Sequence, residues 1–328
     1  MIITKTPLRI SFLGGGTDYP AWYEENHGAV LATTIDKYCY ISCRYLPPFF
    51  KHKSRIVYSK TELVGSIDEI QHPSARECLR FMNIRNGVEV HHDADLPARA
   101  GLGSSSAFTV GLLHALNALN GKIATKEQLG FDAIHVEQKM IQENVGSQDQ
   151  ILAAHGGFNH LRFMGRNKID IASITIDPSR LKEFHSHLLL LFTGFSRTAS
   201  HIASAQILNM KKTHNELCKL YEMVKEGIKI LGSKADIQDF GKLLHEGWMI
   251  KRSLSQKITF PMIDEIYSEA RKAGALGGKL LGAGGGGFML LFAQPSNHEK
   301  IQEKLRAFLH VPFQFENDGS KIIFYKPY

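Results

Sequence analysis

The chain has 328 residues, of which 43% are hydrophobic and 22% charged, and its formal net charge is +7. This length and composition exclude an intrinsically disordered chain and predict two globular lobes. The apolar runs, such as Leu188 to Phe192, fall far short of the roughly 20 residues of a membrane span, so no membrane partner is expected.

The positive charge does not predict nucleic-acid binding. Lysines and arginines are scattered among 32 acidic residues, without a dense basic stripe or a base-stacking motif. An anionic small substrate explains the excess equally well. The four cysteines lack the spacing of a zinc site and are expected to be buried free thiols. With no signal-peptide pattern at the amino terminus, these features predict a cytoplasmic protein.

The residue patterns predict strands and helices in alternation. In chain order we expect strands over 2–12, 28–44 and 87–92, helices over 104–119 and 126–143, and a third helix after Ser147 that carries Asp149 on its first turn. A strand over 188–193, helices over 200–231, 237–255 and 263–273, a strand over 288–292, a helix and a terminal hairpin follow. The sequence therefore predicts an α+β protein of two domains, residues 1–178 and 179–328.

Three glycine-bearing segments stand out along the chain. They are Gly14-Gly15-Gly16-Thr17-Asp18, Gly101-Leu102-Gly103-Ser104-Ser105-Ser106 and Gly282-Ala283-Gly284-Gly285-Gly286-Gly287. The second ends where a helix is expected to begin, so free backbone N–H groups and the positive end of the helix dipole converge there. We therefore expect a phosphate cradle, although a glycine turn that binds nothing is the plainer alternative.

The other glycine patterns argue against two common nucleotide-binding motifs. No Gly-Lys pair is followed by Ser or Thr, so the usual P-loop is absent from the sequence. The third segment matches the dinucleotide fingerprint formally, but the strand 288–292 follows it where the fingerprint requires a helix. A Rossmann oxidoreductase is therefore disfavoured, and the segment is a close-approach loop or a flexible hinge.

In this order and spacing the three segments resemble the GHMP kinases, a family of small-molecule kinases. The likeness runs over essentially the whole chain, and the motif from Pro97 to Ser105 is highly specific. The resemblance implies an N-terminal domain with a left-handed β-α-β crossover, a ferredoxin-like C-terminal domain and a substrate cleft between them. Within the family, the resemblance is most specific to the branch that phosphorylates heptose phosphates and L-fucose. Two departures are visible: Leu281 stands where many members have Thr, and Gly15-Gly16 replace the Glu-His of galactokinases, which argues against galactose.

The resemblance also implies cofactors, ATP and Mg²⁺, and the residues that bind them. ATP contacts are expected from Pro97, Ala100, Gly101, Leu102, Gly103, Ser104, Ser105 and Ser106. The expected magnesium ligands are Ser105 and Glu137, with Glu143 as the rival carboxylate. A surface glutamate is the structural alternative for Glu137.

The catalytic and substrate-binding residues follow from the same resemblance. Asp149 is expected to accept the proton of the acceptor hydroxyl, with Arg9 beside it to keep it ionised. The expected sugar contacts are Gly15, Gly16, Thr17, Asp18, Gly284, Gly285 and Arg197. Arg197 could grip a phosphate bidentately, with Arg44 and Arg99 as alternatives. Asp149 could instead only stabilise its own helix, and Asp18 could only terminate a turn.

The resemblance thus implies a kinase that phosphorylates the anomeric hydroxyl of D-glycero-D-manno-heptose 7-phosphate, for the synthesis of nucleotide-activated heptose. A kinase for an unphosphorylated sugar such as L-fucose stays open. From other classes, the alternatives are the oxidoreductase and a non-catalytic sugar-binding regulator, against which the intact set of Arg9, Glu137 and Asp149 argues. The sequence does not predict the anomer, the adenine pocket or the oligomeric state.

Overall fold

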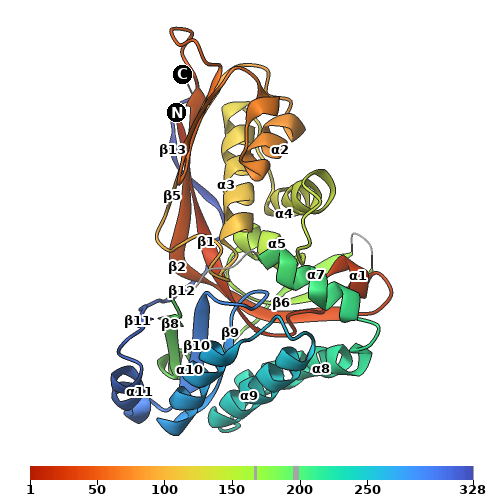
Figure 1. Ribbon diagram of the computed structural model, residues 1–328, viewed down its shortest axis with the longest axis vertical. Coiled ribbons are helices and arrows are strands. Elements are labelled where there is room, and N and C mark those ends of the chain that lie inside the picture. The colour runs from red at the N-terminus through yellow and green to blue at the C-terminus, as the bar shows by residue number, and fades with distance from the viewer. Residues whose placement is uncertain (166–167, 195–198, 328) are drawn as a thin grey trace.

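The computed structural model describes residues 1–165, 168–194 and 199–327, and its strands form two sheets (Figure 1). The larger sheet has nine strands, in which β13, β1, β2, β5, β3 and β4 lie in that order, while β6 and β12 pair with β2 and β7 pairs with β6. Its strands are β1 (Ile2–Leu13), β2 (Gly28–Tyr45), β3 (Ser54–Val57), β4 (Thr61–Val64), β5 (Val88–Ala94), β6 (Phe158–Phe163), β7 (Ile169–Ser173), β12 (Phe315–Glu316) and β13 (Lys321–Tyr325).

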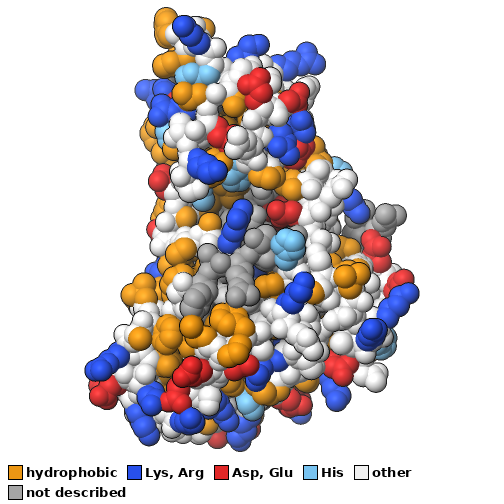
Figure 2. Space-filling model, in the orientation of Figure 1, with side chains coloured by type: hydrophobic (Ala, Val, Ile, Leu, Met, Phe, Trp, Pro, Cys, Tyr) orange, Lys and Arg blue, Asp and Glu red, His pale blue; other side chains and the backbone are white. Residues whose placement is uncertain are grey.

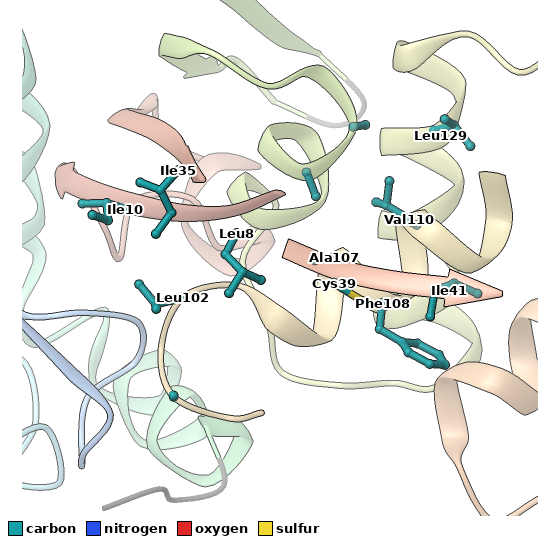
Figure 3. Packing of buried hydrophobic residues seen from close by; sticks show 14 of the residues in the cluster. Leu8, Ile10, Ile35, Cys39, Ile41, Leu102, Ala107, Phe108, Val110 and Leu129 are labelled. Carbon is teal, nitrogen blue, oxygen red and sulfur yellow. The ribbon is translucent and has the colours of Figure 1, made fainter. Parts of the chain in front are cut away.

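Helices of the first half of the chain lie along one side of this sheet (Figure 1). They are α1 (Pro20–Tyr23), α2 (Pro73–Phe81), α3 (Ser104–Leu119), α4 (Lys126–His135) and α5 (Gln148–His155), with a 3-10 turn at Ile67–Glu69 and a π-helical turn at Val136–Met140. The chain has apolar residues on all faces of α3, and nearly all of them are buried because α3 packs between the sheet and the other helices. Figure 3 shows Ala107 and Val110 of α3 beside Leu8, Cys39 and Ile41 of the sheet.

The second lobe is built on a four-stranded sheet in the order β11, β8, β10, β9. Its strands are β8 (Leu188–Phe192), β9 (Ala275–Leu280), β10 (Phe288–Ala293) and β11 (Leu309–His310). Its helices are α6 (Pro178–Ser186), α7 (Ala199–Asn209), α8 (His214–Leu231), α9 (Gln238–Ser253), α10 (Pro261–Lys272) and α11 (His298–Lys304), with a 3-10 turn at Pro295–Asn297. Every residue of β10 is buried, which explains its continuous apolar run.

The mixture of helix and strand confirms the predicted α+β class, but three of the expected elements differ. The expected helix over 200–231 is two helices, α7 and α8, separated by a turn in which Lys212 N donates to Asn209 O at 2.8 Å. The expected helix over 126–143 leaves α-geometry at Val136. The expected terminal hairpin does not form, because β12 pairs with β2 while β13 pairs with β1.

These last pairings bear on the predicted domain division. Residues 315–325 belong to the larger sheet, so the segment expected as the second domain returns to the first at its end. The boundary near residue 178 stays a prediction for the main body of each lobe. Three of the cysteines, Cys39, Cys43 and Cys78, are buried as expected, whereas Cys218 is exposed.

Two surface properties complete the description. In the described parts of the chain, no helix combines the length and apolarity needed to cross a lipid bilayer. On the face drawn in Figure 2, lysine and arginine side chains are interspersed with acidic side chains and do not form one continuous basic area.

Candidate active site

Arg9 and Asp149 form a bidentate ion pair at the centre of the site. Arg9 Nε donates to Asp149 Oδ1 at 2.8 Å, and Arg9 Nη2 donates to Oδ2 at 2.7 Å. The third guanidinium nitrogen, Nη1, donates to Gly101 O at 2.6 Å. The Arg9 side chain is 5% exposed and that of Asp149 23%, so the guanidinium is enclosed while the carboxylate keeps an open side. The expected position of Arg9 beside Asp149 is confirmed.

The amide cradle lies directly beside this pair. Gly103 precedes α3 with a φ of 77°, a left-handed conformation that favours glycine, and no side chain caps the helix. The N–H groups of the first helical turn therefore point away from the helix without an intrahelical partner. A β-carbon at Gly103 would lie 3.2 Å from Arg9 Cγ and 3.5 Å from Asp149 Oδ2. The cradle and the ion pair thus share one small space.

The second and third glycine segments touch each other. A β-carbon at Gly101 would lie 2.5 Å from Leu281 O, and one at Gly282 would lie 2.6 Å from Gly101 Cα. Phe288 N donates to Ala100 O at 3.0 Å, which fixes the two segments side by side. The glycines of these loops are therefore needed for backbone contact between the two lobes.

A cavity of about 180 Å³ opens where these segments meet. Most of the predicted site residues line it, namely Arg9, Gly15, Gly16, Asp18, Gly101, Gly103, Ser104, Ser105, Ser106 and Asp149. A larger cavity of about 630 Å³ lies between α4, α5 and the strands β6 and β7. That larger cavity contains none of the three glycine segments or the Arg9–Asp149 pair, so we place the active site in the smaller one.

Several of the predicted site residues do not line the cavity. Ala100 and Leu102 are 1% exposed, and Thr17 Oγ1 donates to Gly14 O and Ala29 O at 2.8 and 2.9 Å. Gly285 N donates to Ile258 O at 2.8 Å. The predicted residues that the cavity does not reach are Thr17, Pro97, Ala100, Leu102, Glu137, Gly284 and Gly285. Arg197 lies outside the described residues.

Asp18 is a buried carboxylate aimed at the cavity. It is 2% exposed, Oδ1 accepts from Gly16 N at 3.0 Å and Oδ2 accepts from Gln148 Nε2 at 2.8 Å. Burial raises the pKa of Asp18, and the negative charge of Asp149 adds to that effect, while the hydrogen bonds oppose it. A carboxylate held in this way can accept hydrogen bonds from hydroxyl groups of a ligand.

Glu137 lies directly behind the wall of the cavity. It is fully buried, and its Oε2 accepts from Oγ of the cavity-lining Ser106 at 2.9 Å while Oε1 accepts from Thr109 Oγ1 at 2.7 Å. Gln150 Nε2 is a third donor to the same carboxylate. Burial raises the pKa of Glu137 to about 7, against these hydrogen bonds. The alternative of a surface glutamate is therefore wrong, and the role of Glu137 as a magnesium ligand stays a prediction.

The rival carboxylate, Glu143, lines the cavity and is half-buried. Burial raises its pKa, and the positive charge of Arg99 opposes that shift. Ser105 is exposed and also lines the cavity, whereas Ser106 is the serine bonded to Glu137. The carboxylates that line the cavity are therefore Asp18, Glu143 and Asp149.

Two buried lysines were not expected in the site. Lys251, on the last turn of α9, and Lys279, in β9, both line the cavity. The available signal was that Lys279 is the single charged residue in the strand-like run Ala275–Leu280, but the residue pattern could not place its side chain. Gln206 of α7 also reaches the cavity, and its Nε2 donates to Ala283 O at 2.7 Å.

Comparison with known proteins agrees with this geometry. Residues 71–157 match the GHMP kinases N terminal domain, and residues 228–311 match the GHMP kinases C terminal domain. The chain is 26% identical to the D-glycero-alpha-D-manno-heptose 7-phosphate kinase of Campylobacter jejuni over 93% of each chain. It is 24% identical to the bifunctional fucokinase/GDP-fucose pyrophosphorylase of Arabidopsis thaliana, over 90% of this chain and 30% of that protein.

Solved structures show the same fold. A D-glycero-D-manno-heptose 1-phosphate kinase from Bacteroides thetaiotaomicron superposes with a TM-score of 0.78 at 24% identity, over 98% of both chains. The galactokinase of Lactococcus lactis superposes with a TM-score of 0.74 at 15% identity, over 98% of this chain and 94% of that one. The two domain matches together cover more than half of the chain, and the chain therefore belongs to the GHMP kinase family of ATP-dependent phosphotransferases.

Proposed function

We propose that this protein transfers the γ-phosphoryl group of ATP to the anomeric hydroxyl of D-glycero-D-manno-heptose 7-phosphate and so forms the 1,7-bisphosphate. The observation that carries the proposal is the bidentate Arg9–Asp149 pair beside an amide cradle, in a cavity that Asp18 also lines. The choice of sugar rests on the C. jejuni heptose 7-phosphate kinase, which aligns with this chain over 93% of each.

The amides of α3, Asp149 and Arg9 would each have a separate role in phosphoryl transfer. The N–H groups at the start of α3 would hold the nucleotide phosphates, because they are unpaired and lie at the positive end of the helix dipole. As the acceptor oxygen bonds to phosphorus and the bond to ADP breaks, Asp149 would take the hydroxyl proton. Arg9 holds both oxygens of that carboxylate, which fixes its position, and its positive charge offsets negative charge that develops in transfer.

Magnesium fits the residues around α3. Glu137 is a buried carboxylate whose described neighbours are hydrogen-bond donors and not basic groups, and Gln150 Oε1 beside it is buried without a hydrogen-bond partner. A hard cation prefers such oxygen ligands, and magnesium commonly uses one or two carboxylates together with substrate phosphates. Ser105 and Glu137 would hold the ion, with Glu143 as the alternative. When bound, magnesium neutralises charge on the nucleotide phosphates.

The sugar would occupy the side of the cavity formed by the first glycine segment. Asp18 would accept hydrogen bonds from sugar hydroxyls, and Gly15 and Gly16 line the same wall without side chains. Arg197 stays a prediction as a phosphate ligand, since it lies outside the described residues. We further propose that the enzyme acts in the cytoplasm and supplies the synthesis of nucleotide-activated heptose.

An ADP-coupled screen tests the proposal. The purified protein would be assayed with ATP and magnesium against heptose 7-phosphate, the unphosphorylated heptose, L-fucose and galactose. We expect the highest kcat/KM with heptose 7-phosphate. The second candidate is an L-fucose kinase, favoured by the alignment of the A. thaliana fucokinase with 90% of this chain, and a preference for L-fucose would replace the first proposal. Absence of turnover on all four sugars would reject both.

A further inference from the structure

Lys251 and Lys279 are buried inside the active-site cavity, with exposed fractions of 6% and 5%. Each ammonium group donates to one backbone carbonyl: Lys251 Nζ to Gly282 O at 2.5 Å, and Lys279 Nζ to Phe12 O at 2.8 Å. An ammonium group has three donors. Two on each lysine therefore remain for another ligand.

Neither lysine has an acidic partner among the described residues. The ion pairs of that part of the chain include no contact within 4.0 Å between a carboxylate and either Nζ. The hydrogen bonds to Asp149 come from Arg9, and those to Asp18 come from Gly16 N and Gln148 Nε2. A buried charge normally needs a partner, because removing it from water is unfavourable. Neither buried amino group is thus in direct contact with a carboxylate, in a cavity that a ligand can enter.

Electrostatics in the cavity agree with the contacts. Burial lowers the pKa of Lys251 to about 8. Burial also lowers the pKa of Lys279 strongly, and the positive charge of Lys251 lowers it further. The lysines are therefore close enough to repel each other, and a dianion between them would relieve both the repulsion and the lost hydration.

The position of the two lysines indicates which anion they receive. Lys279 is bonded to Phe12, just before the first glycine segment, and Lys251 is bonded to the third glycine segment. Among the acidic groups, Asp18 has the largest influence on the pKa of Lys251. The cradle for nucleotide phosphates is on a different element, at the start of α3. The lysines therefore lie on the sugar side of the cavity.

We propose that Lys251 and Lys279 together bind the phosphate monoester that the sugar already carries, and that this contact makes the enzyme select a phosphorylated acceptor. This assignment rests on the proposed function, because it assumes a sugar phosphate in the cavity. A neutral sugar would leave both ammonium groups buried and unpaired, which explains in physical terms why it would be a poor substrate.

The test replaces each lysine with methionine, which keeps the length and apolar stem of the side chain but removes the charge. Lys242→Met is the matched control, because Lys242 is on the same helix α9 but is exposed, with a surface ion pair to Asp239. For each variant, kcat/KM is measured with heptose 7-phosphate and with the unphosphorylated heptose. Lys251→Gln and Lys279→Gln, which keep a donor for the backbone carbonyl, replace any methionine variant that does not fold.

We expect each lysine variant to lose at least about thirtyfold in kcat/KM for the phosphorylated sugar and less than about threefold for the unphosphorylated one. The preference for the phosphorylated sugar would then collapse, while Lys242→Met would keep it. Equal losses on both sugars would overturn the proposal, because the lysines would then act on the transferred phosphoryl group or only on the loops. An unchanged preference would overturn it as well.

A binding measurement separates this inference from the proposed function. The melting temperature is measured with heptose 7-phosphate and with unphosphorylated heptose, without ATP, for wild type and each variant. If the wild type does not turn over heptose 7-phosphate but is stabilised by it in a lysine-dependent way, the function fails and the lysine assignment stands. If turnover occurs but the stabilisation is the same in the lysine variants, the function stands and the lysine assignment fails.

Discussion

Gly103 is so close to Asp149 that a β-carbon at this position would lie 3.5 Å from the carboxylate oxygen Oδ2. The same β-carbon would lie 3.2 Å from Arg9 Cγ, and the φ of 77° is one that side chains rarely adopt. A side chain at position 103 would therefore crowd Arg9, and the loop that would hold phosphate lies within van der Waals reach of the carboxylate that would accept the proton.

Gly103→Val should abolish the rise in melting temperature that ATP causes, because a branched side chain would occupy the space in front of the amides. The unliganded variant should still fold, at a cost of about 1–3 kcal/mol for the strained backbone. Gly121→Val is the matched control, since Gly121 has a φ of 69° and a β-carbon added there would have nothing within 4 Å. Retained stabilisation by ATP in folded Gly103→Val would place the nucleotide elsewhere.

Asp149→Asn should lower kcat by at least about a hundredfold, because the amide cannot accept the hydroxyl proton. ATP affinity, measured by titration, should stay near that of wild type. Asp170→Asn, which removes a surface partner of Arg162, should leave kcat unchanged. A kcat for Asp149→Asn close to that of wild type would show that Asp149 is not the base. A loss in kcat clearly below a hundredfold would indicate that positioning of the acceptor contributes more than proton removal.

The magnesium requirement should distinguish the two candidate carboxylates. Glu137→Gln is expected to raise the magnesium concentration for half-maximal activity by about tenfold or more, on the scale seen when metal ligands are perturbed. Glu143→Gln should have a smaller effect. The measurement is initial rate against free Mg²⁺ at saturating ATP. The reverse order would assign the ion to Glu143, which lines the cavity.

Glu137 also predicts a pH dependence of stability in the absence of metal. Its folded pKa of about 7 lies above the ordinary value of 4.5, so its contribution is most favourable below pH 4.5 and is lost as the pH rises through 7. Glu137→Gln cannot ionise. In EDTA, the free energy of unfolding of Glu137→Gln relative to wild type should therefore be larger at about pH 8 than at about pH 5, by at most about 3 kcal/mol. The measurement is the melting temperature of both proteins at the two pH values. A difference that is constant with pH would contradict the raised pKa.

The sequence predicted most reliably what depends on local pattern. The helix over 104–119 has the expected bounds, because an apolar run bounded by Gly103 and by Asn120-Gly121 carries its start and end in the residues themselves. The Arg9–Asp149 pair joins residues 140 positions apart, and only the family resemblance could place them together.

What depends on tertiary packing was missed. The break between α7 and α8 occurs at Met210–Thr213, a stretch with no glycine or proline to announce it. Glu137 is buried because α3 lies over it through Ser106 and Thr109, a contact that its own helical neighbours do not indicate. Lys251 and Lys279 come from separate elements of the second lobe, so no spacing in the sequence marks them as a pair.

The pairing of β13 with β1 has a consequence for how the protein is made. β1 leaves the ribosome long before Lys321–Tyr325 of β13 have been translated, because most of the described elements lie between them in the sequence (Figure 1). Domains generally fold in order of synthesis, but during that interval the outer edge of β1 has no neighbouring strand. An open strand edge invites pairing with other chains. The nascent polypeptide is therefore more exposed to aggregation before β13 arrives, and this is the period in which a chaperone would protect the edge of β1.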